Sequence, residues 1–233
     1  MDWDGDALRE LRAAVAQKDV AALCAAVDGR ALDAVLQLAG DGLLAKPDDP
    51  LARECATRLR RRRFEGDAEL ADALEGHARD LRPLAVDLEE LASILEGDPV
   101  RGGGRIDLLT GEIWHHSPYD DHEDDEELED EQHWLWVQAD SHDGWRDMAE
   151  FVSTVTDATL AGRLERALHG RRAFRRFRDE LAAHPEELTR FHLFADERQR
   201  GRARRWLADH GLRPATDAPG SSRGLCAHDG EPE

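Results

Sequence analysis

Two sets of arginines recur at helical spacing in the last third of the sequence. They are Arg171, Arg175 and Arg178, followed by Arg198, Arg202 and Arg205. Residues three or four positions apart lie on one face of an α-helix, so each set predicts a stripe of guanidinium groups. A guanidinium group donates paired hydrogen bonds to a carboxylate or a phosphate. The two stripes therefore predict a surface that binds an acidic protein or the phosphate backbone of a nucleic acid.

Two phenylalanines, Phe174 and Phe177, interrupt the first set of arginines. Their spacing of three residues, continued by Leu181, predicts that both rings pack against the core. No aromatic ring is then left on the surface for base stacking, so sequence-specific recognition of a nucleic acid is not expected. A second interpretation stays open, in which Arg175 and Arg176 pair with acidic residues four positions later on a solvated helix face.

Four histidines lie beside or within an acidic run, and they are His115, His116, His122 and His133. They are weak candidates for metal ligands, because a d-block site needs three or four ligands held in fixed positions. The run from Asp120 to Glu131 is nearly free of apolar residues, and such a run repels itself and stays solvated. We therefore expect a disordered insertion over about residues 118–132, and neither a metal ion nor another cofactor.

The sequence contains none of the spaced motifs that mark common catalytic sites. It has no glycine-rich phosphate loop, no Gly-x-Ser-x-Gly nucleophile turn and no His-Glu-x-x-His zinc motif. The run Gly102-Gly103-Gly104 lacks the lysine and the helix that a phosphate loop requires. We therefore expect a protein that is not an enzyme.

Helices must position these residues, and the first 82 residues predict four or five of them. Leucine and valine recur at three- and four-residue steps, with a break from Pro47 to Pro50. Cys24 and Cys55 fall on apolar faces and are expected to be small buried side chains. The run from Arg60 to Arg63 is expected to be a solvated helix end whose charge compensates the helix dipole.

The residues that follow predict a short sheet. Asp87 is expected to cap a short helix, and apolar and polar residues then alternate on both sides of Thr110-Gly111, which predicts a β-hairpin. Residues 133–137 predict a third strand. Trp114 and Trp136 lie in these apolar segments and are expected in the interface between the sheet and the helices. About four helices follow, with start or stop signals at Asp143, Asp157, Gly170, Pro185 and Gly211.

These elements predict a predominantly helical α+β fold. A small helical bundle is expected over residues 1–82, and an α+β domain over residues 83–212, in which a three-strand antiparallel sheet packs with about four helices. Residues 213–233 are rich in Pro, Gly and Ser and are expected to form a disordered tail.

Charge divides the 233-residue chain more clearly than any linker does. The chain holds 31 basic and 51 acidic residues, a net charge of -20, which excludes a protein that coats DNA or an anionic membrane with its whole surface. Residues 106–150 contain only Arg146 against 16 carboxylates, whereas residues 158–213 contain 14 arginines against 8 carboxylates. This polarity predicts either pairing within the fold or separate surfaces for two kinds of partner.

The sequence also bears on the compartment. No apolar run approaches the length of about 20 residues that a membrane span needs. The first residues are acidic, unlike those of a signal peptide, and the three cysteines are too widely spaced to indicate a disulfide framework or a zinc site. We therefore expect a cytoplasmic protein without membrane contact.

Several runs in the second half of the sequence occur in the same order in one bacterial family. They are Val86 to Leu91, Asp107 to Ile113, Asp143 to Trp145, Gly170 to Asp179, and Arg204 to Leu207. The sequence resembles uncharacterised protein family 0158 over about residues 86–212, and residues 1–85 lie outside the resemblance. Arg172 stands where the family usually has Gly, and Phe191 where it usually has Trp. The resemblance implies an architecture and carries no established activity.

The sequence therefore predicts a non-enzymatic interaction or regulatory module that presents an Arg-rich helical surface to an acidic partner. The alternative is a nucleic-acid-associated protein that contacts backbone phosphates without reading the base sequence. Both interpretations use the same six arginines, so the arrangement of those side chains decides whether either surface exists.

Overall fold

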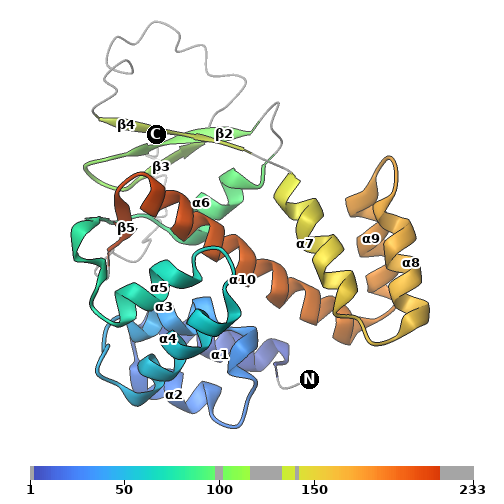
Figure 1. Ribbon diagram of the computed structural model, residues 1–233, viewed down its shortest axis with the longest axis horizontal. Helices are drawn as coiled ribbons and strands as arrows, with labels where there is room; N and C mark the ends of the chain where they lie inside the picture. The colour runs from blue at the N-terminus through green and yellow to red at the C-terminus, as the bar shows by residue number, and fades with distance from the viewer. Residues whose placement is uncertain (1–2, 98–101, 116–132, 140–141, 216–233) are drawn as a thin grey trace, which may run out of the picture.

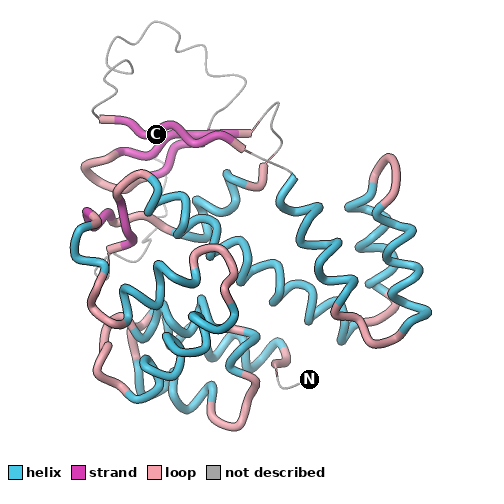
Figure 2. Tube along the Cα trace, in the orientation of Figure 1, coloured by secondary structure: helices cyan, strands magenta, loops and turns pink. Residues whose placement is uncertain are grey.

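The computed structural model describes residues 3–97, 102–115, 133–139 and 142–215 (Figure 1). The predicted insertion at 118–132 and the predicted tail beyond residue 215 lie outside the described residues. Arg213 and Pro214, which the sequence places in the tail, instead belong to a strand. Figure 2 shows the strands gathered at one end of the molecule and helices through the rest, the predominantly helical α+β fold that the sequence predicts.

Residues 3–74 form the N-terminal unit, which consists of five α-helices and one 3-10 helix. They are α1 (Gly5–Ala16), α2 (Val20–Val27), η1 (Leu32–Ala34), α3 (Leu36–Leu43), α4 (Pro50–Arg62) and α5 (Asp67–Leu74). The side chains of Asp4, Asp19 and Asp49 accept hydrogen bonds from backbone N–H groups and so fix the starts of α1, α2 and α4. The apolar faces of these helices meet in one core, in which Leu11 and Leu59 are completely buried.

The predicted hairpin and third strand are confirmed. Strands β2 (Gly103–Asp107), β3 (Ile113–His115) and β4 (Trp134–Gln138) form an antiparallel sheet in the order β3-β2-β4. Helix α6 (Leu88–Leu95), capped by Asp87 as predicted, packs against one face of this sheet. A β-carbon at Gly104 would stand 2.8 Å from the Ile94 side chain, so the glycine permits this close packing.

Four helices complete the fold: α7 (His142–Ser153), α8 (Ala158–Leu168), α9 (Ala173–Ala182) and α10 (Pro185–Asp209). Asp157 caps α8 and Pro185 begins α10, as the sequence predicts. The rings of Phe151 and Phe177 are completely buried in a core between α7, α8 and α9. No helix of the described residues combines the length and the apolar content that crossing a membrane requires.

Helix α10 runs through the middle of the molecule, with the N-terminal unit on one side and α7 and α9 on the other (Figure 1). Its 25 residues pack against α3, α5, α6, α7 and α9. At Gly201 the helix backbone approaches the turn before α5 so closely that a β-carbon at Gly201 or at Gly66 would stand 2.1 Å from a backbone oxygen. The N-terminal unit and α10 therefore share a tightly packed interface.

A second sheet, which the sequence pattern does not predict, joins distant parts of the chain. Strand β1 (Arg82–Leu84) follows a short 3-10 helix, η2 (Ala78–Asp80), and pairs in parallel with β5 (Leu212–Pro214). Strands in proteins usually have about five or six residues, so three-residue strands leave too short a pattern to recognise. This pair places Arg213 beside Pro83, at the end of α10.

Candidate functional site

The six arginines of the two predicted stripes do not form one surface. Arg198 and Arg202 of α10 are only 12% and 8% exposed, and both pair with Asp147 of α7, at 3.0 and 2.7 Å. Arg202 also pairs with Glu96, which follows α6. Breaking a buried ion pair strands a charge away from water, so these two arginines are structural. The second stripe is thus not an exposed surface at these positions, which corrects the prediction.

The remaining arginines of α10 are paired as well. Arg205 is 54% exposed, yet its guanidinium lies 2.7 Å from the carboxylate of Glu69. Arg200 and Arg204 are nearly buried, and both pair with Asp41 of α3. The arginines of α10 therefore neutralise carboxylates of the elements around it, so much of the charge polarity along the sequence is satisfied by pairing within the fold.

The arginine run at the end of α4 also takes part in the interface with α10. Arg62 is only 13% exposed and pairs with Asp67 at 2.8 Å and with Glu197 at 2.9 Å. The expectation of a solvated helix end is wrong for Arg62, because its partners come from the next helix and from α10. Arg62 is therefore a buried structural cation.

Burial raises the pKa of three carboxyls, those of Glu96, Asp196 and Glu197, and all three are held in ion pairs. Burial raises the pKa of the Glu197 carboxyl, and the charge of Arg62 opposes that rise. The Glu197 carboxylate also accepts hydrogen bonds from the backbone N–H groups of Gln37 and Leu38, at the start of α3. Burial likewise raises the pKa of Glu96, again against the charge of an arginine. Shifted pKa values often mark active sites, but these carboxyls form ion pairs in the packing of α10 against its neighbours.

The arginines of the first predicted stripe differ from those of α10. Arg171, Arg175 and Arg178 are all exposed. In the part of the chain that the structure describes, Arg175 lies 3.8 Å from Asp179, both side chains being at least 70% exposed, and the other two have no carboxylate partner. An exposed pair of this kind contributes about 0–1 kcal/mol. Arg171 lies in the turn before α9, so only Arg175 and Arg178 share a face of the helix, which corrects the predicted stripe of three. All three guanidinium groups are nevertheless on the surface.

Phe174 lies beside these arginines on the surface, so the prediction that its ring packs in the core is wrong. Its side chain is 46% exposed, whereas Phe177 is completely buried. Helix residues are separated by about 100°, so positions three apart point about 60° away from each other. Phe177 and Leu181 set the buried direction, and Phe174 falls at its edge, against Gly144 of α7. We name this set the α9 surface: Arg171, Phe174, Arg175 and Arg178.

A second aromatic ring lies close to the α9 surface. Trp145 of α7 is 41% exposed, and its indole N–H donates to the backbone oxygen of Leu168 at the end of α8, at 3.3 Å. The loop between α8 and α9 contains Arg172 in the left-handed conformation, with φ at +63°. A side chain other than glycine is strained there, and such strain is concentrated at binding sites. Exposed rings, available guanidinium groups and a strained loop thus occur together.

A tryptophan cluster, formed by Trp114, Trp134 and Trp136, surrounds Arg105 on the three-strand sheet. The strand register places Arg105 between Trp114 and Trp136, which are 48% and 55% exposed. The expectation that these two tryptophans are buried is wrong, because side chains alternate along a strand and Ile106 takes the inner face. The Arg105 guanidinium lies 4.5 Å from the ring centroid of Trp134 and within 6.0 Å of the other two rings.

Of the four predicted histidine ligands, the structure describes His115 and His133, and these two lie apart. His115 lies 3.4 Å from Glu90, and His133 lies 3.4 Å from Asp107, in two separate contacts. His116 and His122 lie outside the described residues. The described geometry therefore places His115 and His133 in separate contacts, and it does not test the other two histidines.

A different group of possible metal ligands gathers within the described residues. Oxygen and nitrogen atoms of Asp72, Glu75 and His77 lie within 4.8 Å of one another. Arg60 pairs with both carboxylates, at 2.5 and 2.7 Å. Because the guanidinium group already supplies the positive charge, we assign no metal ion to this group.

Comparison with known proteins agrees with the resemblance seen in the sequence. The model of an uncharacterised protein family, UPF0158, matches residues 82–221. A curated relative from Pseudomonas aeruginosa, described as a UPF0158 protein, is 29% identical over 138 residues, which are 58% of this chain and 89% of the relative. No solved structure matches the chain. The α9 surface and the tryptophan cluster both lie in the matched range, and the chain belongs to the uncharacterised protein family UPF0158.

Proposed function

We propose that this protein is a non-enzymatic binding module whose α9 surface holds an acidic segment of a partner protein. The observation that carries the proposal is the exposure of Arg171, Arg175 and Arg178 around the exposed ring of Phe174. The chain has 51 acidic residues, and carboxylates pair with the buried arginines of α10, yet within the described residues Arg171 and Arg178 have no carboxylate partner and Arg175 has only an exposed contact with Asp179. Within α9, Arg175 and Arg178 are like charges at helical spacing, which destabilise a helix by about 0.2–0.5 kcal/mol per pair, and an anionic partner would offset this repulsion.

The composition of the α9 surface suits a protein interface. Aromatic residues and arginine are enriched in interfaces, and they dominate the positions where truncation weakens binding most. Phe174 would bury its ring beneath the partner while the guanidinium groups donate hydrogen bonds to aspartate or glutamate side chains. An apolar contact surrounded by charge-assisted hydrogen bonds supplies both free energy and orientation.

Binding is favoured over catalysis by the way the titratable groups are used. The three carboxyls with pKa values raised by burial, Glu96, Asp196 and Glu197, are paired with Arg202, Arg12 and Arg62 in that order. Groups fixed in this way stabilise the fold and are not free to exchange protons with a substrate. We also propose a cytoplasmic location, which the sparse and widely spaced cysteines support.

A single-stranded nucleic acid is the second candidate partner, because the rings of Phe174 and Trp145 are exposed and Phe174 lies on the same helix as the exposed Arg175 and Arg178. Bases stack on such rings while guanidinium groups contact backbone phosphates, without readout of the base sequence. The net charge of -20 opposes the approach of a polyanion, although screening limits this effect beyond about 8 Å at physiological salt. The protein partner therefore ranks first.

A charge-matched pair of variants tests the proposal. The triple variant Arg171→Gln, Arg175→Gln, Arg178→Gln removes three charges from the α9 surface. The control Arg9→Gln, Arg53→Gln, Arg61→Gln removes three exposed charges from the N-terminal unit. Each full-length protein is used to capture partners from a nuclease-treated cell lysate, and is separately titrated with a fluorescent single-stranded RNA at low and raised salt.

The proposal predicts that acidic proteins captured by the wild type and by the control are lost with the α9 variant. RNA binding that falls steeply with salt and is lost in the α9 variant alone would replace the protein partner with a nucleic acid. Equal losses in both variants, or no loss in either, would show that the α9 surface is only a solvated helix face.

A further inference from the structure

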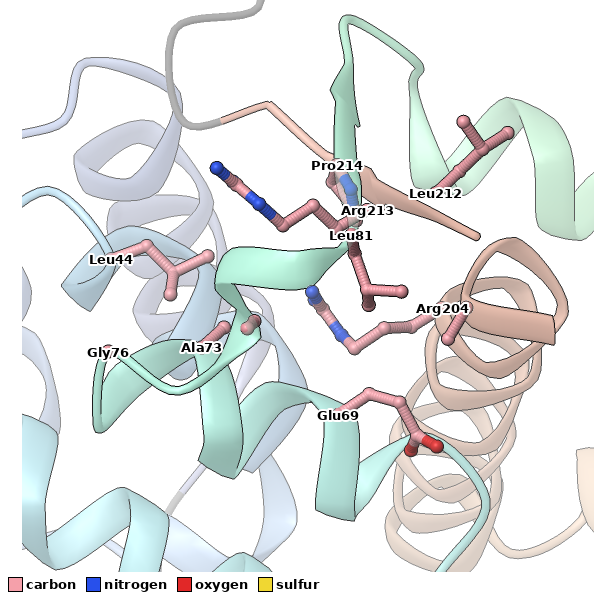
Figure 3. A pocket seen from close by; sticks show the side chains of 11 residues that line it. Leu44, Glu69, Ala73, Gly76, Leu81, Arg204, Leu212, Arg213 and Pro214 are labelled. Carbon is pink, nitrogen blue, oxygen red and sulfur yellow. The ribbon is translucent and has the colours of Figure 1, made fainter. Parts of the chain in front are cut away.

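A cavity of about 220 Å³ lies where the N-terminal unit meets the end of α10 and the β1–β5 pair (Figure 3). Its apolar wall includes Leu44, Leu81 and Leu212, and its charged wall consists of Glu69, Arg204 and Arg213. The cavity is separate from the α9 surface and from the tryptophan cluster, whose residues do not line it.

Arg213 is the one charged residue of this wall without a counter-charge in the described part of the chain. Its Nε atom is buried and has no hydrogen-bond partner. Strand pairing with β1 and a hydrogen bond from the Ala215 N–H to the Leu84 oxygen fix the backbone on both sides of it. In Figure 3 the Arg213 side chain extends from β5 across the cavity toward Leu44. The Arg213 side chain as a whole is half-buried and lines the cavity, so its guanidinium group can meet an anion there.

The other two charged residues of the wall are already neutralised. Arg204 pairs with Asp41, and its Nε donates to the Gln37 side chain at 3.2 Å. Glu69 pairs with Arg205 at 2.7 Å. The cavity therefore has an excess of one positive charge, which belongs to Arg213.

We infer that this cavity binds a small organic monocarboxylate, with the carboxylate on Arg213 and the apolar body against the leucines of the wall. This inference goes beyond the proposed function and does not depend on it. A carboxylate carries one negative charge and matches the planar guanidinium, whereas a phosphate monoester carries about 1.5–2 charges and would exceed the one uncompensated cation. The volume lies below the range of about 300–1,000 Å³ that is typical of drug-sized ligands, so the ligand is small.

The inference is tested with 4-fluorobenzoate as the probe and the full-length protein, by fluorine NMR titration. We expect saturable binding to the wild type and at least about tenfold weaker binding to Arg213→Gln, since each factor of ten corresponds to loss of about 1.4 kcal/mol. Arg61→Gln is the matched control, because it removes an exposed arginine that does not line the cavity and leaves the Arg205–Glu69 pair in place. A third variant, Ala73→Leu, adds an apolar side chain to the wall and should weaken binding while Arg213 stays in place.

Thermal unfolding separates a binding role of Arg213 from a structural one. The melting temperature of Arg213→Gln should equal or exceed that of the wild type, because a buried donor without a partner is removed. Unlabelled benzoate should displace the probe, and neutral benzyl alcohol should not. Equal binding to wild type and Arg213→Gln, no saturable binding at all, or tighter binding of phenyl phosphate than of benzoate would overturn the inference.

Discussion

Arg62 of α4 and Glu197 of α10 form an ion pair at 2.9 Å although 135 residues separate them in the sequence. The same carboxylate accepts hydrogen bonds from backbone N–H groups in the first turn of α3, at 2.7 Å from Gln37. Glu197 therefore binds both a cation and the start of a helix. Helix α3 has no side-chain cap of its own. Residues 82–221, which match the family model, thus supply the residue that caps a helix of the N-terminal unit. This contact joins the two parts of the chain.

Removal of Arg62 should therefore destabilise the whole protein. In Arg62→Met, the buried carboxylates of Glu197 and Asp67 lose their cation, and breaking a buried pair in this way costs about 3–5 kcal/mol. The control Arg58→Met removes a more exposed arginine of the same helix, whose pairs contribute about 0–1 kcal/mol. Urea unfolding measures both free energies, and similar losses in the two variants would contradict the assignment.

The pH dependence of stability should carry a contribution from Glu197. Burial raises the pKa of this carboxyl in the folded state, so the folded protein retains its proton at pH values where the unfolded chain has lost it. The free energy of unfolding contributed by this group must then fall as pH rises from the ordinary pKa of glutamate through the raised value. Urea unfolding of Glu197→Gln across this window should lack that fall.

Glu186→Gln is the matched control for this measurement, because Glu186 is an exposed residue in the first turn of the same helix. Its profile should run parallel to that of the wild type. Parallel profiles for Glu197→Gln as well would mean that Glu197 titrates alike in the folded and unfolded chains.

The tryptophans of the sheet should contribute less to stability than their size suggests. Trp136→Ala leaves no cavity because the ring is 55% exposed, and it removes cross-strand contacts and a cation–π contact worth about 0.5–1 kcal/mol each. Phe151→Ala, in the core of α7 to α9, should cost about 3–5 kcal/mol. Thermal and urea unfolding of both variants provide the comparison, and a loss above about 3 kcal/mol for Trp136→Ala would place its ring in a packed interface after all.

The two phenylalanines of α9 should separate stability from binding. Phe177→Ala creates a cavity in a closed core and should cost about 3–5 kcal/mol. Phe174→Ala should leave the free energy of unfolding within about 1.5 kcal/mol of the wild type, since its ring is half exposed, and should reduce partner capture. If Phe174→Ala captures as much partner as the wild type, the ring is not part of the interface.

Cys55 should be chemically inert in the folded protein. Burial raises the pKa of the Cys55 thiol to about 12, so almost no thiolate is present at neutral pH. Alkylation with iodoacetamide at pH 7.5 or so, read by peptide mass spectrometry, should modify Cys55 only after denaturant is added. Cys24 is less buried and serves as the internal comparison. Rapid modification of native Cys55 would show that its helix opens readily.

Local signals explain the part of the fold that the sequence predicts. Aspartates that cap helices, such as Asp87 and Asp157, act on backbone N–H groups two or three residues away, so the sequence contains both partners. The β2–β3 hairpin is equally local. By contrast, β1 pairs with a strand that follows α10, and no nearby residue identifies that partner.

Local sequence patterns also predict only part of the candidate site, because its other features depend on tertiary packing. Helical spacing identifies Arg175 and Arg178 on one face of α9, but it does not show that the chain leaves the helix before Arg171. Periodicity also does not say which arginines pair with carboxylates elsewhere in the fold: Arg202 pairs with Asp147, 55 residues away in the sequence, through tertiary packing. The spacing of three residues suggests burial of both phenylalanines, but their rings point about 60° apart, and tertiary packing decides that only Phe177 is covered.

The β1–β5 pair also has a consequence for how the chain is synthesised. The ribosome must release all of α10 before Arg82 meets Leu212, so β1 has no partner during translation of the residues between them. Long-range closure of this kind slows folding, and an unpaired strand edge is open to strands of other chains. Each strand contains a proline, Pro83 or Pro214, which removes a backbone donor and limits such pairing. We therefore expect the nascent chain to close this sheet late and with little aggregation.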